Sequence, residues 1–309
     1  MHRQELTKHC KLILNSYVVK DRIVVLCEGT IENIVERSLL PDAIFYNRCV
    51  PRSWIGKPKP TFINCGNRND VINAYFILLE LAQTAIDEGN IISLSTHKLF
   101  AFVDLDIQAR EIPNYHCKNI EEIFSKLYQE NKVAVEDIAK HRIWVTGLIH
   151  KEAYFLQPCF QEFFNSYTPQ PLYEGKPILL TDIYLQICAD TAKDLDLKYA
   201  FRRVIGRIDY CRNLDCASLK RLQNTWQEQF VTCNSFQLRE YLVSALLALR
   251  KAKPYWEKIT FNPDNPNTEE NIRFREQLSR RLAIEISRQD WHDCINHLAY
   301  WFKLLYRLA

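Results

Sequence analysis

Two short apolar runs in this chain each end in acidic residues. Residues 22–27 run directly into Glu28, and residues 99–103 run into Asp104 and, two positions later, Asp106. A continuous run of Val, Ile, Leu and Phe that stops at a turn is typical of a strand buried on both faces. In an open parallel sheet, the carboxyl ends of the strands form the ligand-binding edge. The pattern therefore predicts that the three acids converge at this edge if the two strands are neighbours.

Carboxylates gathered at one edge repel one another, and a divalent cation is the usual reason that such a cluster is stable. Glu32 lies four residues after Glu28, in a helix predicted over 30–40, and can face the same edge. A glutamate in the first turn of a helix is also stable without any function, because the helix dipole favours it. We predict a Mg²⁺ or Mn²⁺ site whose ligands are Glu28, Glu32, Asp104 and Asp106.

Strands and helices alternate through the first half of the chain. Further strands are predicted over 43–46, 61–65 and 142–146, and helices over 70–87 and 119–129. Since β-α-β crossovers are right-handed, this alternation makes the sheet parallel. The expected fold class is α/β, with a parallel sheet flanked by helices.

The second half is expected to be all-α. The apolar residues Leu238, Leu242, Ala245 and Leu249 recur at helical spacing, and the pattern past residue 180 is helical nearly throughout. Four prolines interrupt residues 157–177, which is typical of a domain boundary. We predict a catalytic domain over 1–157, a linker over 158–180 and a helical domain over 181–309.

The last residues, 291–309, are apolar but interrupted by charges. Trp291, Leu298, Phe302 and Leu305 fall at helical spacing, which predicts an amphipathic helix packed on a domain rather than a membrane span. An apolar helix of this kind is compatible with a homodimer. No charged segment followed by a long apolar run opens the chain, so the expected location is the cytoplasm.

Cysteine and histidine patterns argue against a zinc site. The eleven cysteines are scattered, odd in number and never in a Cys-x-x-Cys arrangement, and no His-Glu-x-x-His occurs. Reduced, buried thiols are expected instead.

A charged pair follows the strand predicted over 142–146. Lys151 and Glu152 come a few residues beyond its carboxyl end. Lys151 is a candidate contact for a phosphate or a leaving group, and Glu152 is a candidate further ligand. An ordinary pair of charged residues at the start of a helix is the alternative.

Basic residues are concentrated in two places, although the net charge is only +3. The segment 199–258 holds eleven Lys or Arg residues against five acids, which suits a surface that binds a polyanion. The loop over 47–60 has no acid, three prolines and one tryptophan, which suits phosphate binding and base stacking. Solvated helix faces and a tryptophan that packs on the core are the alternatives. The candidate nucleic-acid-binding residues are Arg48, Arg52, Trp54, Lys57, Lys59, Arg202, Arg203 and Arg207.

The two acidic strand ends together resemble a known domain. Glu28-Gly29-x-x-Glu32 followed by Asp104-x-Asp106 is similar to the Toprim domain of topoisomerases, primases and, most closely, overcoming-lysogenization-defect nucleases. The resemblance covers residues 22–156. Gly66-Asn67 stands where such nucleases also carry a glycine-containing turn.

A second segment resembles stand-alone Toprim proteins that lack an ATPase. Residues 146–156 contain Lys-Glu-Ala-Tyr-Phe-Leu, similar to a segment with a Glu-x-Tyr pattern in a family that includes the effector of the PARIS phage-defence system. Ala153 stands where relatives often have asparagine. The chain has no Gly-x-x-x-x-Gly-Lys-Ser/Thr phosphate loop, so an ATP-dependent trigger would come from a separate partner.

The resemblance implies a metal-dependent Toprim nuclease that acts as the toxic effector of an anti-phage system. It implies cleavage of RNA, with tRNA as the expected target, after release by an ATPase sensor. Phosphate contacts alone do not distinguish RNA from DNA. The alternatives are a DNA nuclease of the overcoming-lysogenization-defect type and a non-catalytic protein that docks a partner. The candidate catalytic residues are Glu28, Asp104, Asp106, Glu32, Lys151 and Glu152.

Overall fold

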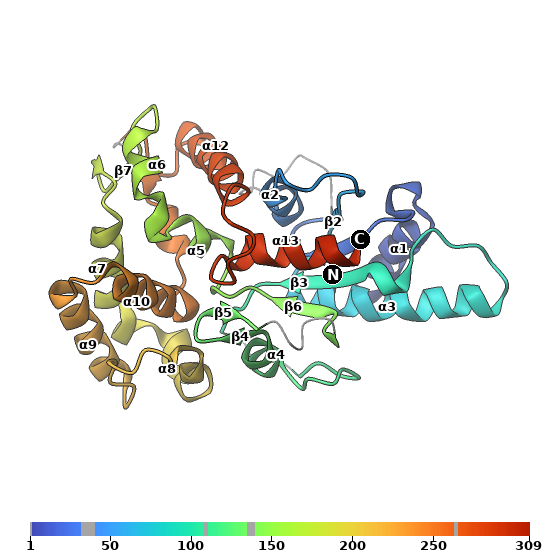
Figure 1. The fold of residues 1–309 in the computed structure, drawn as a ribbon, viewed down its shortest axis with the longest axis horizontal. Coiled ribbons are helices and arrows are strands. Elements are labelled where there is room, and N and C mark those ends of the chain that lie inside the picture. Colours follow the sequence, from blue (N-terminus) through green and yellow to red (C-terminus); the bar gives the residue numbers. More distant parts are fainter. Residues whose placement is uncertain (1, 32–40, 108–110, 135–139, 263–264) are drawn as a thin grey trace. The chain divides into compact units, whose positions relative to one another are not determined.

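The computed structural model describes residues 2–31, 41–107, 111–134, 140–262 and 265–309 (Figure 1). The chain divides into two compact units that interleave along the sequence. Unit 1 comprises residues 1–104, 133–145 and 283–309, and unit 2 comprises residues 105–132 and 146–282. These units differ from the three consecutive segments predicted above, since the carboxy-terminal residues pack on the amino-terminal sheet.

Unit 1 is built around a four-stranded parallel sheet. Its strands are β1 (Val24–Cys27), β2 (Thr61–Asn64), β3 (Leu99–Val103) and β6 (Ile143–Val145), in the order β2-β1-β3-β6. All three pairings are parallel, and Cys27 lies in register with Asn64 of β2 and Phe102 of β3. Four of the five predicted strands and the parallel sheet are therefore confirmed.

The prediction of a strand over 43–46 is wrong, because this segment lies in helix α2 (Asp42–Cys49). Pro41 precedes the helix, Asp42 lies in its first turn and Arg48 lies in its last turn. Proline before a helix, an acid in its first turn and a base in its last turn all stabilise the helix. Together they favour a helix more strongly than an apolar run of only four residues favours a strand. The helix predicted over 30–40 lies almost entirely outside the described residues.

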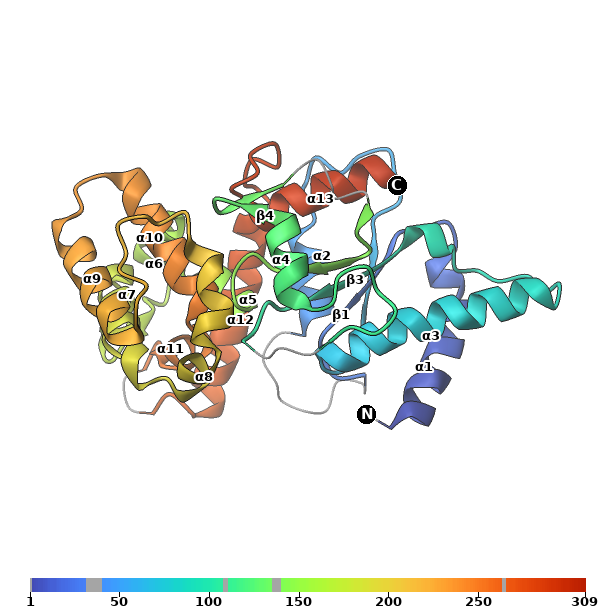
Figure 2. The same cartoon turned by 90° about the horizontal axis from the view of Figure 1, so that it is seen from below.

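Helices cover both faces of the sheet (Figure 2). On one face, α3 (Arg68–Asp87) packs along β1 and β3, and α1 (Arg3–Asn15) packs on α3. On the other face lie α2 and α13 (His297–Leu308). The indole of Trp301 in α13 lies 4.2 Å from that of Trp144 in β6, and the ring of Tyr46 in α2 lies 4.9 Å from that of Phe102 in β3.

The carboxy-terminal helix packs on a domain, as its spacing predicts. Leu298, Phe302 and Leu305 of α13 are buried, and the ring of Phe302 lies 5.9 Å from that of Phe62 in β2. Because this apolar face is buried within unit 1, it offers no surface to a second copy, and the homodimer stays a prediction. Within the described parts of the chain, no helix has the length and apolarity that crossing a membrane requires.

Unit 2 is mainly helical, which confirms the prediction of helices past residue 180. Its helices are α4 (Ile120–Leu127), α5 (Lys151–Phe155), α6 (Gln161–Ser166), α7 (Leu180–Ala189), α8 (Leu195–Val204), α9 (Leu219–Thr232), α10 (Phe236–Leu249), α11 (Lys253–Trp256) and α12 (Glu269–Ile286), the last of which ends in unit 1. A short hairpin, β4 (Tyr128–Gln129) and β5 (Lys132–Val133), follows α4.

The segment predicted as a linker, 158–180, contains regular structure. It carries α6 and the antiparallel strands β7 (Leu172–Tyr173) and β8 (Lys176–Pro177), and β9 (Ile259–Thr260) pairs with β7 to complete a small sheet. Glu174 and Gly175 form the tight turn between β7 and β8, with φ angles of 50° and 79°. Two left-handed residues are what a two-residue hairpin turn requires.

Candidate active site

Two candidate carboxylates meet at the carboxyl edge of the unit 1 sheet. Glu28 directly follows β1 and Asp104 directly follows β3, and the two strands are paired in parallel. The backbone N–H of Asp104 donates a hydrogen bond to Oε1 of Glu28 at 3.0 Å. Both residues are half-buried, and Oδ1 of Asp104 is fully buried. Unit 1 thus brings Glu28 and Asp104 together, as the strand pattern predicts, whereas Glu32 lies outside the described residues.

Two glycines join the neighbouring loops at this edge. Gly29 and Gly66 follow β1 and β2, and each backbone N–H donates to the other residue's carbonyl, at 2.8 and 2.7 Å. Their φ angles are 134° and 94°, a region that residues with a side chain rarely adopt. A Cβ atom at Gly66 would lie 2.6 Å from Oδ2 of Asp70, which accepts the N–H of Asn67 and caps α3. The glycines therefore allow the loop of Glu28 to lie close to the start of α3.

We expect Gly66→Ala to lower the free energy of unfolding by about 2–4 kcal/mol, the sum of left-handed strain and a steric clash. Gly89→Ala is the matched control, because Gly89 has a φ of 71° but no atom within 4 Å of the added Cβ. Gly89→Ala introduces the left-handed backbone strain without a steric clash, so its free energy of unfolding should fall by only about 1–2 kcal/mol. Urea unfolding measures both values. Equal losses in the two variants would show that the loop contact adds nothing to stability.

Asp106 belongs to unit 2, where the chain after β3 is bonded to the chain after β6. The N–H of Asp106 donates to the carbonyl of Ile149 at 3.0 Å, and the N–H of Leu105 donates to Oγ1 of Thr146 at 2.9 Å. Asp106 has a φ of 27°, and its Oδ1 accepts the N–H of Ile107 at 2.6 Å. These bonds hold the backbone that carries Asp106 against the segment that leads to Lys151 and Glu152.

Glu152 is a buried carboxylate in α5 of unit 2. Its Oε2 lies 3.0 Å from Nδ1 of His150, and Nε2 of His150 accepts the backbone N–H of Lys253 at 3.4 Å. Burial raises the pKa of Glu152, but the interaction with His150 and the positive charge of Lys151 lower it by more, to about 2. The carboxylate is therefore ionised and held in place, which is typical of a positioned or structural acid.

We expect Glu152→Gln to cost about 3 kcal/mol of unfolding free energy at pH 7. Because the folded-state pKa of about 2 lies below the ordinary 4.5, this stabilisation is complete above about pH 4.5 and is lost as the pH falls toward 2. Urea unfolding at pH 7 and pH 3 measures the difference from the unsubstituted protein, which should shrink at pH 3. Glu228→Gln, an exposed glutamate in α9, should show no such dependence. A deficit that stays constant between the two pH values would contradict the prediction.

The basic loop over 47–60 is held on unit 1 by two of the residues predicted to bind nucleic acid. Trp54 is only 4% exposed, its Nε1 donates to the carbonyls of Lys57 and Pro58 at 3.2 Å, and its ring lies 5.2 Å from that of Tyr306. Nζ of Lys57 donates to the carbonyl of Tyr306 at 2.9 Å. The prediction that Trp54 stacks on a base is therefore wrong, since Trp54 packs on the core.

The other basic residues of the segment 47–60 are exposed, and its first three residues, Arg48 among them, lie in the last turn of α2 rather than in a loop. Arg52 and Lys59 lie on the surface, and Arg48 lines a groove of about 620 Å³ together with Arg22. Arg22 precedes β1, so this groove lies at the amino end of the strand. A strand of four residues separates that end from Glu28 by about 13 Å. Arg48 therefore does not lie beside the carboxylates.

The arginines predicted from the basic segment differ in their surroundings. Arg202 is exposed, and Arg203 is exposed but donates from Nη2 to the carbonyl of Ile107 at 2.6 Å. Arg207 is 4% exposed and forms an ion pair with Glu121. The prediction that Arg207 binds a nucleic-acid backbone is therefore wrong, because its guanidinium is used inside unit 2.

Two buried residues that organise this part of unit 2, Thr146 and Tyr154, were not predicted as site residues, and the structural role of Arg207 was not predicted either. Oγ1 of Thr146 accepts from Leu105 and donates to the carbonyl of Leu148 at 2.7 Å. The hydroxyl oxygen of Tyr154 accepts the N–H groups of Gly147 and Leu148, at 2.8 and 3.3 Å. Nη1 and Nη2 of Arg207 donate to main-chain carbonyls. The sequence offered two signals, the threonine at the end of a buried strand and the tyrosine of the Glu-x-Tyr pattern.

Comparisons with known proteins add no relative. No protein-family model, no curated protein and no solved structure matches the chain.

Proposed function

We propose that the chain is a metal-dependent nuclease of the Toprim type, which hydrolyses phosphodiester bonds in RNA. The single observation that carries the proposal is the contact between Glu28 and Asp104 at the carboxyl ends of two neighbouring parallel strands, where the N–H of Asp104 donates to the Glu28 carboxylate at 3.0 Å. Ligands of open parallel sheets bind at this edge.

The residues present suit a hard divalent cation. Glu28 and Asp104 contribute carboxylate oxygens, the donors that Mg²⁺ and Mn²⁺ prefer, and both residues are half-buried at the edge of the sheet. Asp106 and Glu32 are the proposed further ligands. When bound, the metal would supply Lewis-acid stabilisation of charge on the phosphate and a water of lowered pKa.

The protein's own groups would hold and orient the substrate. Lys151, at the start of α5, would bind a phosphate oxygen, and exposed arginines such as Arg202 would bind the nucleic-acid backbone through charge. The ionised Glu152 would orient His150 rather than accept a proton, since its pKa of about 2 makes it a weak base. A separate ATPase sensor that releases this effector during infection completes the proposal.

A cleavage assay with purified protein tests the proposal. Pooled tRNA and duplex DNA are incubated with Mg²⁺, with Mn²⁺ or with a chelator, and an Asp104→Asn, Asp106→Asn double variant is tested beside the unsubstituted protein. We expect tRNA to be cut only with metal and only by the unsubstituted protein. Cutting of duplex DNA alone would favour a nuclease of the overcoming-lysogenization-defect type.

A calorimetric titration with Mn²⁺ covers the case in which neither substrate is cut. Binding that the double variant loses would support a metal site held inactive without its partner. No binding by the unsubstituted protein would overturn the proposal and favour a non-catalytic docking protein.

A further inference from the structure

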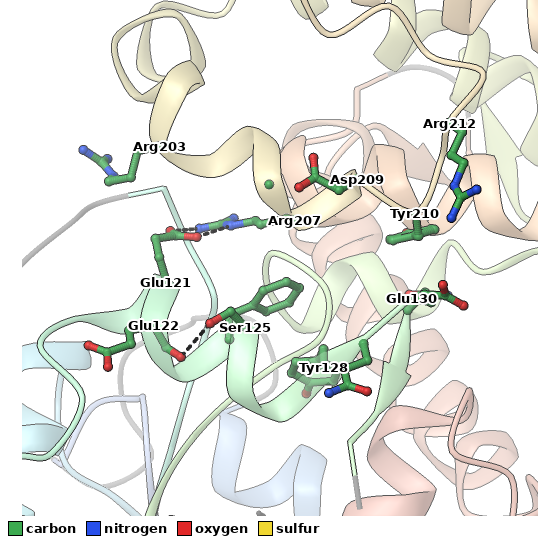
Figure 3. A pocket seen from close by; sticks show the side chains of 14 residues that line it. Glu121, Glu122, Ser125, Tyr128, Glu130, Arg203, Arg207, Asp209, Tyr210 and Arg212 are labelled. Atoms are coloured by element: carbon green, nitrogen blue, oxygen red, sulfur yellow. Dashed lines mark hydrogen bonds and ion pairs between the residues drawn. The ribbon is translucent and has the colours of Figure 1, made fainter.

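Unit 2 contains a cavity of about 700 Å³, a size typical of sites for small ligands (Figure 3). One wall is α4 with the turn that follows it, and the other is the segment from Arg203 through the 3₁₀ helix η6 (Ile205–Ile208) to Arg212. Every lining residue belongs to unit 2. This cavity is separate in sequence from the carboxylates of unit 1.

The apolar part of the cavity is aromatic and fixed. Phe124 and Tyr128 line one side, with ring centroids 4.9 Å apart and planes inclined by 29°. The guanidinium of Arg207 lies 5.9 Å from the centre of the Phe124 ring, and Tyr210 lines the opposite wall. Aromatic rings are surfaces on which single-stranded nucleic acids place their bases, and Phe124 and Tyr128, although only 9% and 5% exposed, border the cavity.

Two of the acids in the cavity are already neutralised. Glu121 pairs with Arg207, and Glu122 pairs with Lys126 at 3.0 Å. Glu130 and Asp209 form no ion pair in the parts of the chain that the structure describes. These two carboxylates accept hydrogen bonds only, so they suit a ligand that carries amino groups.

The free positive charge lies at the two ends of the cavity. Figure 3 shows Arg203 and Arg212 at opposite ends, with Asp209 between them. Both arginines are exposed, and Arg212 has no hydrogen bond or ion pair within the described residues. A ligand that is planar and amino-bearing in the middle and anionic at both ends matches this arrangement.

We infer that the cavity binds one unpaired nucleotide of a nucleic-acid strand. The base lies against Phe124 and Tyr128, Asp209 or Glu130 accepts from its amino group, and Arg203 and Arg212 bind the phosphates on either side. Adenine, guanine and cytosine carry such an amino group and uracil does not, so uridine is the least favoured nucleotide. This inference rests on the proposed function for its substrate class.

RNA binding is measured by fluorescence anisotropy with fluorescein-labelled twelve-nucleotide RNAs. A chelator is present to remove divalent metal, so that no RNA is cleaved during the measurement. The probes are oligoadenylate, oligocytidylate, oligouridylate and a duplex of mixed sequence. We expect oligoadenylate and oligocytidylate to bind more tightly than oligouridylate, and single strands more tightly than the duplex. Two variants fill the cavity from opposite walls, Ser125→Trp and Gly206→Phe, and each should weaken binding about tenfold or more, the contribution of one stacked base.

The chain offers a close control for the first variant. Ser125 and Ser166 are both exposed helical serines whose hydroxyls donate to a carbonyl in the preceding turn, at 3.0 and 2.9 Å, but Ser166 lies outside the cavity. Ser166→Trp should bind RNA as the unsubstituted protein does. A Cβ at Gly206 meets no atom closer than 3.7 Å, so that backbone accepts a side chain without strain.

Salt dependence tests the phosphate contact separately. Arg212→Gln should reduce the slope of log K against log salt by about 0.7, the value for one phosphate on a single strand. Arg280→Gln, an exposed arginine of α12, should leave the slope unchanged. The inference is overturned if Ser125→Trp and Gly206→Phe bind RNA as tightly as Ser166→Trp.

The two proposals fail in different assays. If Glu28→Gln still cleaves RNA but the filled-cavity variants lose binding, the metal site is wrong and the nucleotide site stands. If cleavage needs Glu28 while the filled-cavity variants bind normally, the nucleotide site is wrong and the nuclease stands.

Discussion

Glu28→Gln is expected to reduce metal-dependent cleavage about 10³-fold, because one charged ligand is lost and metal ions contribute several kcal/mol to the transition state. Glutamine keeps the size of the side chain, and its amide oxygen can still accept the N–H of Asp104. The variant therefore removes charge without releasing the loop after β3. Initial rates over a range of Mn²⁺ concentrations measure the effect, and a higher metal requirement should accompany the lower rate.

Glu80→Gln is the matched control for this variant. Glu80 is an exposed glutamate of α3 in the same unit, and the exchange removes the same charge away from the sheet edge. Its cleavage rate and metal requirement should equal those of the unsubstituted protein. Thermal unfolding should be similar for both variants. A Glu28→Gln protein that cleaves at the unsubstituted rate would remove Glu28 from the proposed metal site.

Much of the sheet could be predicted from the sequence, because buried parallel strands are continuous apolar runs that end at turns. The runs before Glu28 and Asp104 gave both the strands and the edge where the acids meet. The run over 43–46 failed because four apolar residues fit a helix face equally well. The interleaved units could not be predicted either, since no local pattern reveals that Trp301 of α13 packs on Trp144 of β6, far away in the sequence.

The basic residues could be counted from the sequence but not assigned a role. Charge composition does not reveal whether a guanidinium faces solvent or a buried partner, and Arg202 and Arg207 are five positions apart with opposite surroundings. The same limit applies to Trp54, whose loop was predicted to be exposed, but whose indole is buried and donates to two carbonyls of that same loop. In each case the contacts made in the folded protein determine whether the side chain is exposed or buried.

Arg207→Met is expected to lower the free energy of unfolding by about 3–5 kcal/mol, the usual cost of breaking a buried ion pair. The Arg207 side chain is 1% exposed, its Nε donates to Glu121 at 2.8 Å, and Nη1 and Nη2 donate to the carbonyls of Ala248 and Asp106 at 2.9 and 2.7 Å. Methionine fills much of the space but leaves the Glu121 charge and these carbonyls without a donor. Urea unfolding measures the loss.

Arg202→Met is the matched control, and the two variants should behave in opposite ways. Exposed Arg202 should add little to stability, but its loss should flatten the salt dependence of RNA binding if it contacts a phosphate. Loss of Arg207 should lower stability and leave that salt dependence unchanged, because its donors are bonded within unit 2.

Adding Glu121→Gln to Arg207→Met should recover part of the stability, since the unpaired buried charge is removed. If Arg207→Met is as stable as Arg202→Met, the buried pair does not hold the loop of Asp106, and the position of that carboxylate must depend on the bonds from Thr146 and Ile149 alone.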